Sequence, residues 1–181
     1  MRRSLKSRAL QLLAQRDQSR VELRRKLMRH ARSSAADRAA PGPADPAPDE
    51  GSGDEDAVSA EVDALLDWLE ANRFLSNTRF AESRVHARQA RFGLLRIENE
   101  LARHEVDLPP ELAQSLAGSE LDRAAAVRER RFARLPGDAA ERAAQSRFLL
   151  GRGFAPDVVQ RLMRRLTRSV AGEGRGAPRA D

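Results

Sequence analysis

The sequence predicts an all-α protein built from three consecutive three-helix repeats, about nine helices in all. Three observations support this fold class. Apolar residues recur at helical spacing along nearly the whole chain. No segment shows the strict alternation or the β-branched enrichment of a strand. A Leu-x-Arg pattern followed by His or Gly recurs from Leu27, Leu101 and Leu150, each time where the second helix of a repeat is predicted to end.

The composition points to a thin hydrophobic core. Hydrophobic residues make up 40% of the chain, but 31 of the 181 residues are alanine, so large apolar side chains are few. A repeat array buries surface mainly between neighbouring units and needs no large central core. The composition therefore favours an elongated array over one large globule.

The first repeat is predicted over residues 1–75. Apolar residues from Leu5 to Leu13 are spaced as in an amphipathic helix. Ser19-Arg20-Val21-Glu22 is a capping box that opens a second helix. The third helix is expected from about Ser59 to Asn72, because apolar residues again fall on one face.

An acidic insertion interrupts this repeat. Residues 32–57 are rich in Pro, Gly, Ser, Asp and Ala, and we expect them to form a disordered linker between helices two and three. Residues 33–57 carry a net charge of −6, whereas the whole chain carries +6, so the remainder carries +12. This surplus indicates a polyanionic partner.

The second repeat is predicted over residues 76–118. Ser76 is a plausible N-cap, Gly93 separates the first helix from the second, and Pro109 or Pro110 opens the third.

The third repeat is predicted over residues 119–170, followed by a disordered tail over 171–181. Its helices are expected from Glu120 to Leu135, from Asp138 to Leu150 and from Pro156 to about Thr167.

The residues that usually carry catalysis or bind metals are missing or isolated. The chain has no cysteine, and none of its three histidines has a second ligand at metal-binding spacing. No glycine-rich loop follows a strand, and no signal peptide or membrane span is evident. We therefore expect a non-enzymatic cytoplasmic protein without metal or cofactor.

Arginine dominates the basic residues, at 31 of 33, and three predicted helices carry it in stripes. Such stripes in a basic chain predict a surface that faces a nucleoprotein, although each alone would also suit a solvated helix face. The residues expected to bind are Arg24, Arg25, Arg29, Arg84, Arg88, Arg91, Arg96, Arg103, Arg161, Arg164, Arg165 and Arg168.

Several motifs resemble the RecX family in order and spacing. The run from Leu65 to Leu101 resembles the family's central signature, through Arg79-Phe80-Ala81, Arg88, Gly93, Arg96-Ile97 and Glu100-Leu101. The segments Arg8 to Leu13 and Glu22 to Leu27 are similar to the first repeat of the family, and Phe148 to Phe154 to its third. The resemblance covers almost the whole chain except the linker and the tail.

This resemblance implies a curved array of three three-helix repeats. It further implies a regulator that binds the RecA filament on single-stranded DNA, touching the DNA directly or through the filament. We expect this regulator to be a monomer. Such binding would limit filament growth and damp strand exchange, ATP hydrolysis and co-protease activity, and so modulate recombinational repair and the SOS response.

Two alternatives are a stand-alone DNA-binding module and a purely structural helical adaptor with a peptide groove. The first helix, the Arg-Asp-Gln-Ser turn and the second helix resemble a helix-turn-helix, in which Arg20, Arg24 and Arg25 would read base edges.

Overall fold

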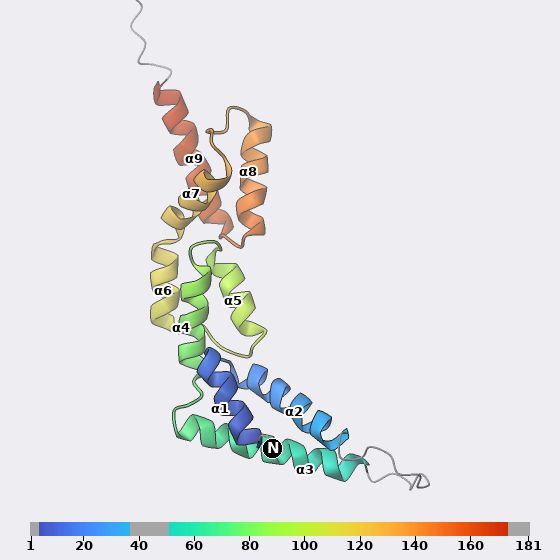
Figure 1. Cartoon of the computed structure of the whole chain (residues 1–181). Coiled ribbons are helices and arrows are strands. Elements are labelled where there is room, and N and C mark those ends of the chain that lie inside the picture. Colours follow the sequence, from blue (N-terminus) through green and yellow to red (C-terminus); the bar gives the residue numbers. More distant parts are fainter. Residues whose placement is uncertain (1–3, 37–50, 174–181) are drawn as a thin grey trace, which may run out of the picture. The chain divides into compact units, whose positions relative to one another are not determined.

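The computed structural model describes residues 4–36 and 51–173, and within these ranges it contains nine α-helices and no strand. The all-α fold class is therefore confirmed (Figure 1). The helices are α1 Leu5–Gln15, α2 Arg20–Ala36, α3 Gly51–Ala71, α4 Asn77–Arg88, α5 Leu94–Ala102, α6 Pro110–Gly118, α7 Glu120–Arg131, α8 Ala139–Gly151 and α9 Pro156–Glu173.

The nine helices follow one another in three sets of three, as expected for three-helix repeats. They belong to two compact units. The first contains α1, α2, α3, the start of α4 and the segment His104–Val106; the second contains the rest of α4 and α5 to α9. The repeat boundaries and the elongated, curved arrangement stay predictions.

The three helices of the first unit share one hydrophobic core, as their apolar stripes predict. Leu23 and Leu27 of α2 are fully buried against α1 and α3. The buried residues of this core are Ala9, Leu12, Leu23, Leu27, Val62, Leu66, Leu69 and Leu75.

The predicted helix starts at Ser19 and Ser76 are confirmed. The Ser19 hydroxyl accepts a hydrogen bond from the backbone N–H of Glu22 at 3.1 Å, and the Ser76 hydroxyl accepts one from Arg79 at 3.2 Å. The carboxylate of Glu22 pairs with Arg16 and Lys26 instead of completing the capping box.

Helices α2 and α3 are longer than their apolar patterns predicted. Helix α2 continues to Ala36 and α3 begins at Gly51, so both extend into the predicted linker. The Ser and Ala residues that end α2 include no helix breaker, and an ion pair between Arg32 and Glu55 joins the two helices there. The expectation of disorder over 37–50, and over the tail beyond 173, concerns residues outside the described ranges.

Helix α7 is shorter than predicted and ends at Arg131 instead of Leu135. Leaving the helix places Phe132 edge-on against Phe148, with ring centroids 5.3 Å apart. In addition, Pro136 disfavours a helical conformation for Leu135.

The second and third helix triplets meet through backbone at two glycines. The N–H of Gly93 donates to the Arg152 carbonyl at 3.0 Å, and the N–H of Leu95 donates to the Gly153 carbonyl at 3.2 Å. A Cβ atom on Gly93 would lie 2.3 Å from the carbonyl oxygen of Gly153 and from two backbone atoms of Phe154. Gly93 has φ −79° and ψ 171°, which suit any residue, so the lack of space alone requires glycine here.

The first turn of α7 caps the N-terminal ends of two other helices. Glu120 is 2% exposed, and its Oε1 accepts hydrogen bonds from the N–H of Leu94 at 2.9 Å and of Ala155 at 3.3 Å. These groups lie at the starts of α5 and α9, where a negative charge is favoured.

The same turn caps two C-terminal helix ends through Arg123. Its guanidinium donates to three carbonyl oxygens at the ends of α4 and α6, those of Gln89 (3.0 Å), Phe92 (2.8 Å) and Leu116 (2.9 Å). Burial lowers the pKa of Arg123 below its ordinary value, and the neighbouring carboxylate of Glu120 only partly offsets this shift. One helical turn therefore satisfies groups at four helix ends.

Candidate functional site

Arginine-rich surfaces are the candidate sites on this protein. Within residues 4–36 and 51–173, no helix is long and apolar enough to span a bilayer. The same ranges contain no group of three or more His, Asp or Glu side chains that could hold a metal ion. Some of the guanidinium groups are available to a partner, and others serve the fold.

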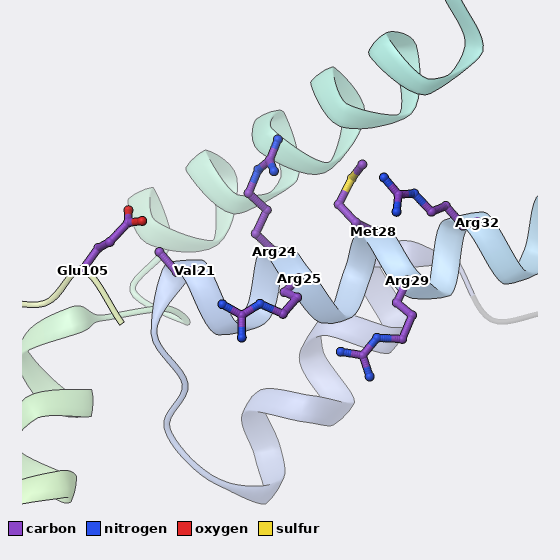
Figure 2. A pocket seen from close by; sticks show the side chains of 7 residues that line it. All are labelled: Val21, Arg24, Arg25, Met28, Arg29, Arg32 and Glu105. Carbon is purple, nitrogen blue, oxygen red and sulfur yellow. The ribbon is translucent and has the colours of Figure 1, made fainter. Parts of the chain in front are cut away.

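A groove of about 530 Å³ lies along α2 in the first unit (Figure 2). We call it the α2 groove. Four arginines of one helix line it, together with two apolar residues of α2 and one acid from the segment after α5. The lining residues are Val21, Arg24, Arg25, Met28, Arg29, Arg32 and Glu105.

Two of these arginines are tied to α3. Arg24 reaches up to α3 (Figure 2) and holds Asp63 in a two-point ion pair, with Nε–Oδ1 at 2.7 Å and Nη2–Oδ2 at 2.9 Å. The hydrogen bond raises the pKa of Arg24 and lowers the pKa of Asp63. Arg32 pairs with Glu55. These two residues hold α2 against α3, so their charges are neutralised inside the unit.

Arg25 and Arg29 are exposed and have no carboxylate partner among the described residues. Both point away from α3 in Figure 2 and lie one helical turn apart. A guanidinium presents a planar fork of donors that fits phosphate or carboxylate oxygens at two points. This pair is therefore the part of the α2 groove that can bind an anion.

The stripe predicted on α4 is largely internal to the second unit. Arg84 and Arg88 both pair with Glu100 of α5, at 3.4 and 3.1 Å. Arg91 is exposed and without a carboxylate partner within the described ranges. One of the three arginines in the predicted stripe is therefore without a carboxylate partner, and the other two share a single carboxylate.

Around the half-buried ring of Phe92, four arginines gather. Arg96 lies nearest, with its guanidinium carbon 4.6 Å from the ring centroid, and Arg88, Arg91 and Arg152 lie at 5.7–5.8 Å. Arg152 was absent from the residues predicted to bind, because its closeness to Phe92 depends on the contact between α5 and the end of α8. Arg103, at the end of α5, is exposed and away from this group of contacts.

The stripe on α9 is confirmed as an exposed helix face. A shallow groove of about 540 Å³ on this face is lined by Arg161, Arg164, Arg165 and Arg168. On the opposite side, Val158, Leu162 and Met163 are buried in the core of the last three helices. Arg161 forms an ion pair with Asp157 at 3.5 Å. Arg164 and Arg168 lie on the exposed side one turn apart and form no ion pair with described residues.

Two arginines, one buried and one half-buried, belong to the fold and were not singled out from the sequence. Arg128 is 4% exposed and donates to Gln145 at 2.9 Å, and Arg123 caps helix ends. No sequence signal distinguishes them from surface arginines except their position on the apolar side of α7.

Comparison with known proteins assigns the family. The family model described as "RecX, third three-helix domain" matches residues 119–163. A protein of Ralstonia nicotianae named Regulatory protein RecX is 47% identical over 162 residues, which cover 88% of this chain and 86% of the relative. The chain belongs to the RecX family. Another Regulatory protein RecX, from Herbaspirillum seropedicae, is 44% identical over 84% of each chain.

A solved RecX structure supports the fold. The crystal structure of RecX from Lactobacillus salivarius matches with a TM-score of 0.60, at 16% sequence identity, over 90% of this chain and 94% of that one. The family motifs can be located in the present structure. Gly93 and Gly153 form the backbone contact between helix triplets, and Arg79 holds the turn after α3 by donating to the Arg73 and Phe74 carbonyls.

Proposed function

We propose that this protein binds the RecA filament on single-stranded DNA and limits its growth. By doing so it lowers strand exchange, ATP hydrolysis and co-protease activity, and it modulates recombinational repair and the SOS response. It acts in the cytoplasm as a monomer, by binding alone, without a cofactor.

The observation that supports this function most directly is the pair of unneutralised arginines in the α2 groove. A RecX-family chain that acts by binding needs charges that its own fold does not neutralise. Arg25 and Arg29 meet that requirement, whereas Arg24 and Arg32 do not. Arg164 and Arg168 of α9 supply a second pair. Both pairs suit the acidic side chains and phosphates of a nucleoprotein filament.

The helix-turn-helix alternative is disfavoured by the contacts of α2. Arg20 pairs with Asp67 at 2.7 Å and with Glu70 at 2.6 Å, and Arg24 pairs with Asp63. Reading bases would require breaking these pairs, which hold α2 on α3. Only Arg25 of the three expected readers is free to contact a base.

The direct test adds the purified protein to RecA already assembled on single-stranded DNA. We expect ATP hydrolysis to fall and filaments to shorten at near-stoichiometric protein. Unchanged hydrolysis and filament length would refute the regulatory function. Sequence-specific binding to duplex DNA without any effect on RecA would support the helix-turn-helix alternative instead.

A charge-reversal pair tests the α2 groove. The double variant Arg25→Glu and Arg29→Glu should bind the filament at least about tenfold more weakly, and its binding should depend less on salt. The matched control is Arg134→Glu with Arg147→Glu, two arginines exposed outside the candidate surfaces. Equal weakening by both doubles would mean that only the net charge matters and that the α2 groove is not a contact.

A further inference from the structure

Two large aromatic side chains lie exposed together at the end of α3. Trp68 is 37% exposed and Phe74 is 46% exposed, and their rings stack with centroids 5.7 Å apart and planes 19° apart. In the described part of the chain only four large apolar side chains are exposed, and these are two of them. Exposed aromatic rings of this size are typical of binding surfaces.

The turn that places Phe74 on Trp68 is held by the backbone and by one arginine. The N–H of Phe74 donates to the Leu69 carbonyl at 2.9 Å, which reverses the chain at the end of α3. The guanidinium of Arg79 donates to the carbonyls of Arg73 and Phe74, both at 3.0 Å. The position of Phe74 is therefore set before any partner arrives.

A residue with a strained backbone lies inside this turn. Arg73 has φ 61°, a left-handed conformation that normally favours glycine at a helix end and disfavours residues with a side chain. Arginine at this position lowers the stability of the fold and places an exposed positive charge next to Phe74 in the chain. Strain of this kind gathers at functional sites.

The local charge is positive around the rings. The ammonium of Lys6 lies 3.6 Å from the centroid of the Trp68 ring. The nearest acids on α3, Asp67 and Glu70, are both paired with Arg20 and so repel an anion less. An exposed pair of aromatic rings flanked by cations matches the way in which proteins hold single-stranded nucleic acid.

We infer that Trp68 and Phe74 form a stacking site for the bases of single-stranded nucleic acid, with Lys6 and Arg73 contacting the adjacent phosphates. An unstacked base extends the aromatic pair on Phe74, the more exposed ring. Duplex DNA does not fit, because its bases are already stacked on one another. The site concerns free single strands and so goes beyond the proposed function, which requires RecA.

The sole tryptophan makes the site directly observable. Trp68 is the only tryptophan in the chain, so its fluorescence reports on this surface alone. The full-length protein is titrated with an oligothymidylate of about 15 nucleotides and with an abasic strand of equal length and charge. We expect the oligothymidylate to quench the fluorescence and to bind more tightly, and the abasic strand to do neither.

Two variants assign the effect to the ring. Phe74→Ala should weaken oligothymidylate binding about tenfold and leave abasic binding unchanged, whereas Phe74→Tyr should retain both. Leu150→Ala removes an equally exposed apolar side chain far along the chain and is the matched control. Circular dichroism of each variant checks that the helices are intact.

Two results would overturn the inference. The first is equal binding of the two strands by the unaltered protein. The second is a Phe74→Ala variant that binds oligothymidylate normally. If that variant also no longer lowers ATP hydrolysis by RecA, the aromatic pair contacts protein instead of nucleic acid. Failure of the proposed function is distinguishable: the unaltered protein would leave RecA unaffected while still preferring the strand with bases.

Discussion

Replacing Gly93 by alanine should separate the second and third helix triplets. The added Cβ would lie 2.3 Å from the Gly153 carbonyl oxygen and from the N and Cα atoms of Phe154. All three are backbone atoms, so no side chain can rotate away to make room. The contact must open, although the backbone angles of Gly93 suit alanine.

The expected loss of stability follows from the contacts that open between the two helix triplets. Two backbone hydrogen bonds, at 3.0 and 3.2 Å, are lost or stretched, and each contributes about 0.5–1.5 kcal/mol. Phe154, which is 1% exposed, must also shift within its core, at a cost of about 1–2 kcal/mol. We therefore expect the free energy of unfolding to fall by about 3 kcal/mol, and Tm to fall by roughly 6–12 °C.

Gly151→Ala is the matched control in the same segment. Gly151 is the last residue of α8, and nothing lies within 4 Å of its added Cβ. This change should be neutral or stabilise the helix by up to about 1 kcal/mol. Urea unfolding followed by circular dichroism at 222 nm measures both variants. If Gly93→Ala unfolds within about 0.5 kcal/mol of Gly151→Ala, the close approach is not what requires glycine.

Three further changes test other parts of the fold. Glu120→Ala leaves two half-buried N–H groups without an acceptor and should destabilise the protein by about 2–4 kcal/mol in urea, whereas Glu120→Gln should lose about half of that. Burial raises the pKa of Glu22, but hydrogen bonds from Arg16 and Lys26 outweigh it and lower this pKa to about 2. Its contribution, about 2 kcal/mol after screening of the half-exposed Arg16, is complete above about pH 5 and is lost as the pH falls towards 2, which acid titration of unfolding measures. Arg73→Gly relieves a left-handed backbone and should raise the free energy of unfolding by about 0.5–1 kcal/mol, measured by thermal melting.

Each of these changes has an outcome that contradicts its reasoning. Equal stability of Glu120→Ala and Glu120→Gln would show that the carboxylate position does not cap the helices. A Glu22→Gln variant with an unchanged acid transition would exclude Glu22 from it. Loss of stability in Arg73→Gly would mean that its side chain holds the turn.

Helical periodicity predicted the fold class because burial follows the apolar stripe of each helix. Leu23, Leu27, Val158 and Leu162 are buried as that stripe requires. The helix starts were also predictable, because a capping side chain such as that of Ser19 bonds to a backbone N–H only three residues away. The end of α2, the start of α3 and the end of α7 were missed, because contacts between helices, such as Arg32 with Glu55 and Phe132 with Phe148, contribute to them.

The availability of each arginine was not predictable from spacing. A helical wheel places Arg24 and Arg25 on the polar side alike, yet Arg24 is neutralised by Asp63, 39 residues away. The aromatic pair was hidden for a different reason. Trp68 and Phe74 meet only because Arg73 takes a left-handed conformation, which its residue type disfavours.

The turn that opens α7 bears on how this array can evolve. Repeat proteins commonly gain or lose units when each junction is interchangeable. Here Glu120 and Arg123 cap three helices that precede α7, namely α4, α5 and α6, and one helix of its own triplet, α9. Deleting a triplet on either side of this junction, or inserting a copy of one, would leave helix ends without their capping partners. The number of helix triplets is therefore constrained by a few polar side chains at this junction. A chain with a different number of triplets would need other capping residues there.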